Sequence, residues 1–144
     1  MATNTTANTS AKSAKPTASM SRKVNPGFVS HTELASTDPG ATKAWATKVL
    51  GWQFGEPAAT PTGPYHMWRH EEPLSGGGIR ATNPGEHAGT TPFVEVPDIK
   101  KAHQAAIKAG ATEMYAPMQV GEGMGWISCV KAPGGPTIGF WSTT

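Results

Sequence analysis

The chain contains a single cysteine, Cys129, and no apolar run long enough to cross a membrane. One cysteine cannot form an internal disulfide, so the sequence predicts neither a disulfide-stabilised secreted fold nor an integral membrane protein. Charged residues are also scarce, at 15% of the 144 residues. These absences favour a cytoplasmic protein with one folded domain, because a chain of this length buries one core and not two.

Acidic residues are missing from the first 24 positions, which hold four of the 12 basic residues. The remainder has eight basic residues against ten acidic ones, so it lacks the basic surface that nucleic-acid binding needs. The opening "MATNTTANTSAKSAKPTAS" has no large apolar side chain and cannot offset the entropy cost of ordering. We expect a disordered tail over residues 1–26 and a folded domain over residues 27–144.

Alternating side chains predict a strand over residues 28–36, in which His31 and Glu33 share a face. A helix follows, because Asp38 has the side chain of an N-cap and proline occupies the first helical position. Gly51 is expected to end this helix, because the residue that follows a helix often adopts a left-handed conformation that glycine favours.

The same helix is expected to bury a stripe of Ala41, Trp45 and Val49, with Trp45 in the core. A turn-rich segment comes next. It precedes two short strands at residues 65–70 and 77–82, and the intervening link "EEPLSG" has the composition of a turn.

The second half repeats this order of elements. Residues 91–96 form a predicted strand, Asp98 caps the next helix, and Gly110 closes it. His103 is placed at the boundary of that helix's apolar face, which consists of Ile99, Ala102, Ala106 and Ile107. Three further strands are predicted in "TEMYAPM", "GWISCVKA" and "TIGFWS".

Three stretches carry a family resemblance: "HTELASTDPGATKAWATKVLGW", "FVEVPDIKKAHQAAIKAGA" and "VKAPGGPTIGFWS". With them the chain resembles the vicinal oxygen chelate superfamily, which holds glyoxalase I, the bleomycin and fosfomycin resistance proteins and the extradiol dioxygenases. "ELASTDPGATKAW" and "GGI" are typical of its small glyoxalase-related branch. The resemblance implies an α+β fold, in which two βαβββ modules form a curled, cup-shaped mixed sheet with two helices outside.

In metal-dependent members of that superfamily four ligands lie on the first and last strands of each module. The resemblance places these positions at His31, Gly78, Thr91 and Gly139, and only His31 carries a good metal ligand. We therefore predict no cofactor. The alternative is a divalent metal held by a rebuilt set of His31, Glu33 and Glu95.

Without a metal, His31 and Glu33 are the candidate catalytic pair, in which either side chain acts as a general base. The competing interpretation is a hydrogen-bonded pair in a wet cavity. Arg80 either clamps a carboxylate or phosphate of the ligand or reaches to solvent. The candidate ligand-binding residues are Gly78, Arg80, Thr91, Phe93, Glu95 and Trp141.

Three further features bear on the cup. Cys129 is expected to be a buried small apolar residue. The glycine-rich segment 119–125 is interpreted either as a mobile cover for the cup or as an ordinary hairpin turn. Trp141 and other aromatic side chains predict a wall suited to a planar or apolar ligand.

Together these features predict a glyoxalase-like protein that binds a small organic molecule, as a lyase or isomerase without the usual metal. One alternative is a non-catalytic protein that sequesters a drug-type molecule. A further alternative is a metal-dependent glyoxalase-type lyase. The resemblance also implies a homodimer, and neither nucleic acid nor a membrane is an expected partner.

Overall fold

A computed structural model describes residues 24–70 and 75–144 of the chain. Most of the predicted tail, and the core of the predicted turn "EEPLSG", lie outside these residues. Within the described part, the backbone N–H of Asn25 donates to the Glu95 carboxylate at 2.8 Å. The Gly27 N–H donates to the Glu95 carbonyl at 3.0 Å. Within the described residues, Asn25 of the predicted tail thus already makes a hydrogen bond to the domain.

The first module consists of a strand, a helix and three strands. These are β1 (Val29–Ser36), α1 (Pro39–Leu50), β2 (Ala58–Thr60), β3 (Gly63–His70) and β4 (Ser75–Ala81). The predicted helix and the longer strands are confirmed within a few residues. The short strand β2 lies in the segment that was predicted only as a turn, because three residues are too few to show an alternating pattern.

The second module has the same order of elements. These are β5 (Gly89–Glu95), α2 (Ile99–Lys108), β6 (Thr112–Gln119), β7 (Trp126–Lys131) and β8 (Thr137–Ser142). The repeat predicted from the order of elements is confirmed.

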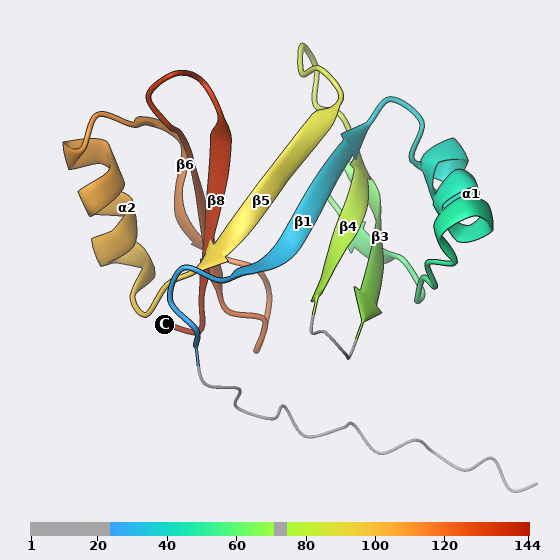
Figure 1. The fold of residues 1–144 in the computed structure, drawn as a ribbon, viewed down its shortest axis with the longest axis horizontal. Helices are drawn as coiled ribbons and strands as arrows, with labels where there is room; N and C mark the ends of the chain where they lie inside the picture. Colours follow the sequence, from blue (N-terminus) through green and yellow to red (C-terminus); the bar gives the residue numbers. More distant parts are fainter. Residues whose placement is uncertain (1–23, 71–74) are drawn as a thin grey trace, which may run out of the picture.

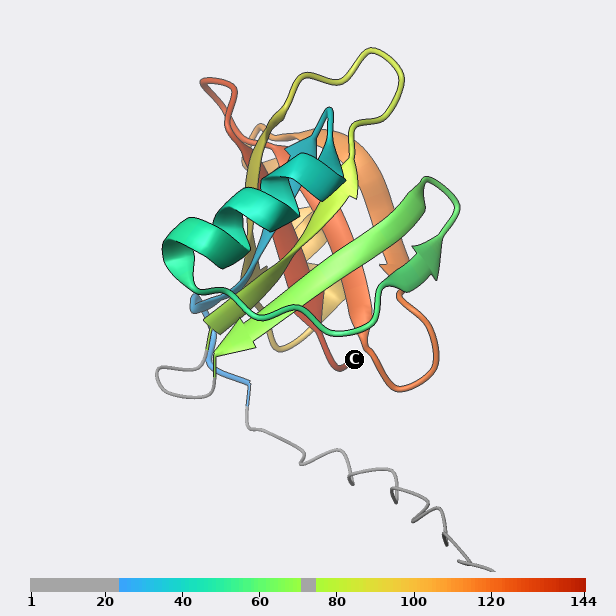
Figure 2. The ribbon, with the colours of Figure 1, turned by 90° about the vertical axis from the view of Figure 1, so that its right-hand side faces the viewer.

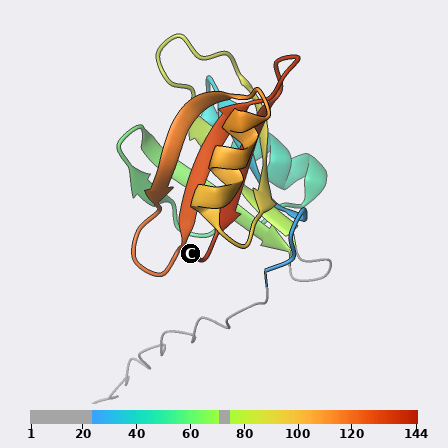
Figure 3. The ribbon, with the colours of Figure 1, turned by 90° about the vertical axis from the view of Figure 1, so that its left-hand side faces the viewer.

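All eight strands form one mixed sheet in the order β2-β3-β4-β1-β5-β8-β7-β6 (Figure 1). Strand β1 pairs parallel to β4 and antiparallel to β5, and β5 pairs parallel to β8. The sheet curls between the helices, with α1 across the outer side of the first module (Figure 2) and α2 across that of the second (Figure 3). The predicted α+β cup is confirmed.

Both helices begin at the predicted aspartates. The Asp38 carboxylate accepts the Ala41 N–H at 2.9 Å, and the Asp98 carboxylate accepts the Lys101 N–H at 3.0 Å. Gly51 follows α1 with a left-handed φ of 69°, which costs glycine little. Neither helix of the described chain is long and apolar enough to span a bilayer.

The prediction for the buried face of α1 is wrong. Trp45 is 57% exposed and Val49 is 58% exposed, whereas Ala46 is 1% exposed. The aromatic side chain that packs on β4 is Trp68 of β3, which lies over Gly77 and stacks on Trp52 with 4.1 Å between ring centroids. Because the rings of Trp52 and Trp68 fill the space beside β4, helix α1 turns the small side chain of Ala46 toward the sheet.

The prediction for His103 on α2 is also wrong. His103 is 5% exposed, and its Nε2 lies 2.7 Å from the Glu113 carboxylate, while Ile107 is 38% exposed. Residues four apart share a helix face, so His103 lies on the same face as the buried Ile99. The carboxylate of Glu113 gives the imidazole a partner there.

We predict that Trp45→Ala will lower the free energy of unfolding far less than Trp68→Ala. Truncating a buried aromatic side chain costs about 3–5 kcal/mol, and only Trp68 is buried. Urea denaturation of the two variants, followed by circular dichroism, makes the comparison. Equal losses would contradict the orientation of α1.

Candidate functional site

His31 lies in an aromatic cluster within the cup. Its Nε2 is 2.7 Å from the Tyr65 hydroxyl, its ring stacks on Tyr65 with centroids 6.2 Å apart, and it meets Phe93 edge-on at 5.8 Å. Burial lowers the pKa of His31 below its ordinary value, and burial first and the Glu33 charge second raise the pKa of Tyr65. The cluster therefore favours a neutral imidazole beside a protonated phenol.

The rings of this cluster lie where two of the aligned metal-ligand positions lie. A Cβ atom added to Gly78 would overlap the Tyr65 ring, and one added to Gly139 would overlap the Phe93 ring. Glycine at these positions thus accommodates aromatic side chains from inside the protein. The space that a metal-ligating side chain would need at either position is therefore already filled by a ring.

The residues present do not fit a metal centre of the type that the fold family uses. Gly78 and Gly139 have no side chain to donate to a metal, and the Nε2 of His31 is hydrogen-bonded to Tyr65. The rebuilt set is not assembled either, because Glu33 binds Arg80 and Glu95 binds the backbone of Asn25. Within residues 24–70 and 75–144, no three His, Cys, Asp or Glu side chains are placed to hold an ion.

Glu33 belongs to a second cluster, which consists of Glu33, Arg80 and Glu86. The Arg80 Nε donates to Glu33 Oε1 at 2.8 Å, and its two terminal nitrogens donate to the two Glu86 oxygens at 2.7 Å each. Hydrogen bonds from Arg80 hold the pKa of Glu86 at about 2, and the two carboxylates raise the pKa of Arg80. Glu86 and Arg80 are therefore both charged over the physiological range.

The strand register explains how this cluster forms. Arg80 on β4 lies opposite Ala35 on β1, and Glu33 lies opposite Gly78. The small side chain of Ala35 leaves room for the guanidinium to cross to Glu33, whereas the space beside Gly78 holds the Tyr65 ring. Glu86 reaches Arg80 from the loop between β4 and β5, where its Oε2 also accepts the Asn83 N–H at 2.8 Å.

This cluster forms one wall of a cavity of about 530 Å³, which we call the loop cavity. Residues 83–87 line it, all from the loop drawn between β4 and β5 at the top of Figure 1. Three residues predicted to bind the ligand or act on it also line it: Glu33, Arg80 and Thr91. The second module contributes Met114, Tyr115, Cys129 and Thr137.

The other predicted site residues are not among those that line the loop cavity. They are His31, Gly78, Phe93, Glu95 and Trp141. Trp141 donates its indole N–H to the Met124 carbonyl at 3.0 Å, so it holds the segment after β6. The described lining contains no tryptophan, and the predicted aromatic wall is replaced by a single ring, that of Tyr115.

The glycine-rich segment after β6 is a hairpin turn, closed by a hydrogen bond of 3.0 Å from the Val120 N–H to the Gly125 carbonyl. It follows the far end of β6 from Met114 and Tyr115, which line the loop cavity. The segment thus has the geometry of the hairpin turn that was one of its two interpretations, and it does not line the loop cavity. The residues beside the cavity come from the loop at 82–88 instead.

Cys129 is 3% exposed, as predicted for a buried small residue. Burial first, and the charge of Glu33 second, raise the pKa of its thiol to about 11. The thiol is thus protonated at neutral pH, and a thiolate nucleophile is not available at the cavity wall.

Glu86 and Tyr115 are the residues that the sequence interpretation missed. Glu86 lies in "NPGEHAG", which has the composition of a turn, and Tyr115 lies on the strand farthest from β1 in the second module. The loop after β4 brings Glu86 to Arg80, and the curl of the sheet brings Tyr115 to the same cavity as Glu33. No local pattern in the sequence signals that approach.

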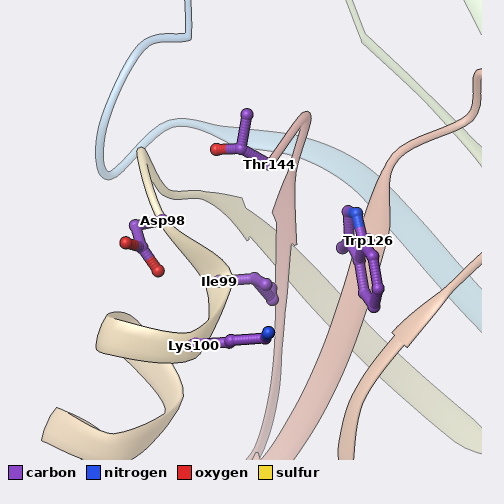
Figure 4. Close-up of a pocket in the computed structure, with 5 residues that line it drawn as sticks. All are labelled: Asp98, Ile99, Lys100, Trp126 and Thr144. Carbon is purple, nitrogen blue, oxygen red and sulfur yellow. The ribbon is translucent and has the colours of Figure 1, made fainter.

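A smaller hollow of about 240 Å³ lies at the start of α2, beside Trp126 and Thr144 (Figure 4). Two of its polar side chains, Asp98 and Thr144, are already engaged in hydrogen bonds within the protein. The Asp98 carboxylate caps the helix, and the Thr144 hydroxyl donates to the Pro97 carbonyl at 2.9 Å. The loop cavity is the better candidate because it is larger and holds a fixed cluster of charges.

Two βαβββ modules joined edge to edge into a curled sheet define a class of cup-shaped proteins. The class is that of the vicinal oxygen chelate fold, and the chain has this fold. A methylmalonyl-CoA epimerase from Mycobacterium tuberculosis matches with a TM-score of 0.64 at 14% identity, over 84% of this chain and 89% of that one.

Two other structures agree. A glyoxalase/bleomycin resistance protein/dioxygenase superfamily member from Vibrio splendidus 12B01 matches with a TM-score of 0.57 at 16% identity, over 77% of this chain and 94% of that one. A hypothetical protein from Bacillus halodurans C-125 matches with a TM-score of 0.63 at 12% identity, over 82% of this chain and 95% of that one. No protein-family model matches the sequence, and the comparison with curated proteins gives no match.

We predict that Gly78→Ala will destabilise the fold by about 1–3 kcal/mol, the usual cost of overpacking a core. The same substitution should cost much less in a Tyr65→Ala background, because the ring that the new Cβ meets is gone. Thermal or urea unfolding of the four chains gives the coupling energy.

Gly55→Ala is the matched control for this cycle, since a Cβ there meets nothing within 4 Å. Its cost should not depend on Tyr65. Equal costs of Gly78→Ala in both backgrounds would show that Tyr65 does not fill this position.

Proposed function

We propose that the protein binds a small organic molecule in the loop cavity without a metal ion, and that Glu33 is the fixed polar contact for it. The observation that carries this proposal is the Arg80 bond to Glu33 Oε1, which holds the carboxylate at the wall of the cavity. The cavity volume of about 530 Å³ falls within the range of small-molecule sites, about 300–1,000 Å³.

The position of the charges favours binding at this end of the cup over its centre. The centre is filled by the aromatic cluster of His31, Tyr65 and Phe93. At the loop cavity, by contrast, Glu33 remains 20% exposed. A ligand can therefore reach Glu33 without displacing a ring.

A second candidate function is proton transfer at carbon, with Glu33 as the base. The M. tuberculosis structure with the same fold is a methylmalonyl-CoA epimerase, and epimerisation requires removal of a proton from carbon. Arg80 keeps Glu33 close to a fixed geometry, as a general base requires. His31 is the weaker candidate for this role, since its Nε2 is hydrogen-bonded to Tyr65 and it is not among the cavity-lining residues.

Binding is tested by titrating the ¹⁵N-labelled full chain with benzyl alcohol, benzylamine and benzoate, and following amide shifts. We predict that at least one probe shifts the signals of Thr91 and Cys129, which line the loop cavity. Thr91→Trp should weaken that binding by filling the cavity. Thr112→Trp, at an exposed strand position, should leave it unchanged.

Shifts confined to Lys100 and Trp126 beside the smaller hollow, or no shifts at all, would contradict the proposal. Turnover is judged separately, by ¹H NMR of methylmalonyl-CoA in D₂O. Exchange of its C2 proton that disappears in Glu33→Gln would favour proton transfer. Ligand binding without exchange would favour sequestration.

A further inference from the structure

We infer that the ligand of the loop cavity carries a cationic amine, which is received by the Glu33 carboxylate. This inference rests on the proposed function and names the chemical class of its ligand. It follows from which hydrogen-bonding groups of the cavity are already used and which remain open.

Arg80 has little capacity left for an anionic ligand. A guanidinium has five N–H donors, and four of them are engaged, one by Glu33, two by Glu86 and one by the Ala81 carbonyl at 2.9 Å. The two bonds to Glu86 form the paired arrangement that a carboxylate ligand would use. Glu86 thus already occupies the position that a ligand carboxylate would take on Arg80.

Glu33 has the opposite property. Its Oε1 accepts from Arg80, whereas no donor from the described part of the chain contacts its Oε2. A carboxylate oxygen can accept more than one hydrogen bond. The open acceptor at the cavity wall therefore calls for a donor on the ligand.

The balance of charge selects a cationic donor over a neutral one. Two carboxylates, Glu33 and Glu86, line the cavity against one guanidinium, that of Arg80, and no lysine is among the lining residues. With the His87 imidazole counted as neutral, the formal net charge of the lining is −1. Tyr115 lines the same cavity, and aromatic rings attract cations.

The test compares three probes of similar shape, benzylamine, benzyl alcohol and benzoate, by amide shifts of the full chain at pH 8. Benzylamine should bind the loop cavity about tenfold more tightly than benzoate, the factor that one charge-assisted hydrogen bond supplies. Glu33→Gln should remove that preference. Glu56→Gln, at an exposed position outside the cavity, should preserve it.

Glu86→Gln provides an independent test, because it keeps the shape of residue 86 and removes its charge. Arg80 then loses its paired carboxylate, and benzoate affinity should rise about tenfold. The amide signals of Asn83 and of residues 85–87 show whether the loop stays in place in this variant.

The outcomes separate the two proposals. Benzoate that binds the wild-type cavity as tightly as benzylamine overturns the amine class and leaves small-molecule binding intact. Absence of cavity shifts with all three probes overturns the proposed function itself. Benzylamine binding that survives Glu33→Gln without loss overturns the assignment of Glu33 as the receiving group.

Discussion

Antiparallel pairing between β1 and β5 joins the two modules and fixes which side chains meet inside the cup. It places His31 opposite Phe93 and Glu33 opposite Thr91. Parallel pairing of β1 with β4 then sets Gly78 beside Glu33, and pairing of β5 with β8 sets Gly139 beside Phe93. Because side chains alternate along a strand, a shift by one residue would turn all of them out of the cup.

Two neighbouring regions of the cup hold different kinds of side chain. Around His31 the glycines admit the rings of Tyr65 and Phe93, so aromatic side chains fill this region. Toward the loop at 82–88, the small side chain of Ala35 leaves room for Arg80 to join Glu33 and Glu86 around a cavity. The fold that elsewhere can hold a metal at its centre thus keeps its polar chemistry at one end.

The sequence predicts most of this fold and part of the site. Asp38 and Gly51 mark the first helix because capping depends on local backbone geometry, and local geometry is readable from sequence. The error for Trp45 arises because two aromatic side chains, Trp45 and Trp68, compete for one side of β4, and only packing decides between them. His31 and Glu33 share a strand face as predicted, yet they do not act as a pair. His31 is hydrogen-bonded to Tyr65 and Glu33 to Arg80, and both partners come from distant parts of the sequence.

The central claim is that aromatic rings stand where the fold family places a metal centre. The most direct measurement is elemental analysis of untagged protein as purified, followed by calorimetric titration with Zn²⁺. We predict no stoichiometric ion after purification and no binding that depends on His31 in the titration. One equivalent of ion per chain, lost in His31→Ala and retained in a control His87→Ala chain, would contradict the account.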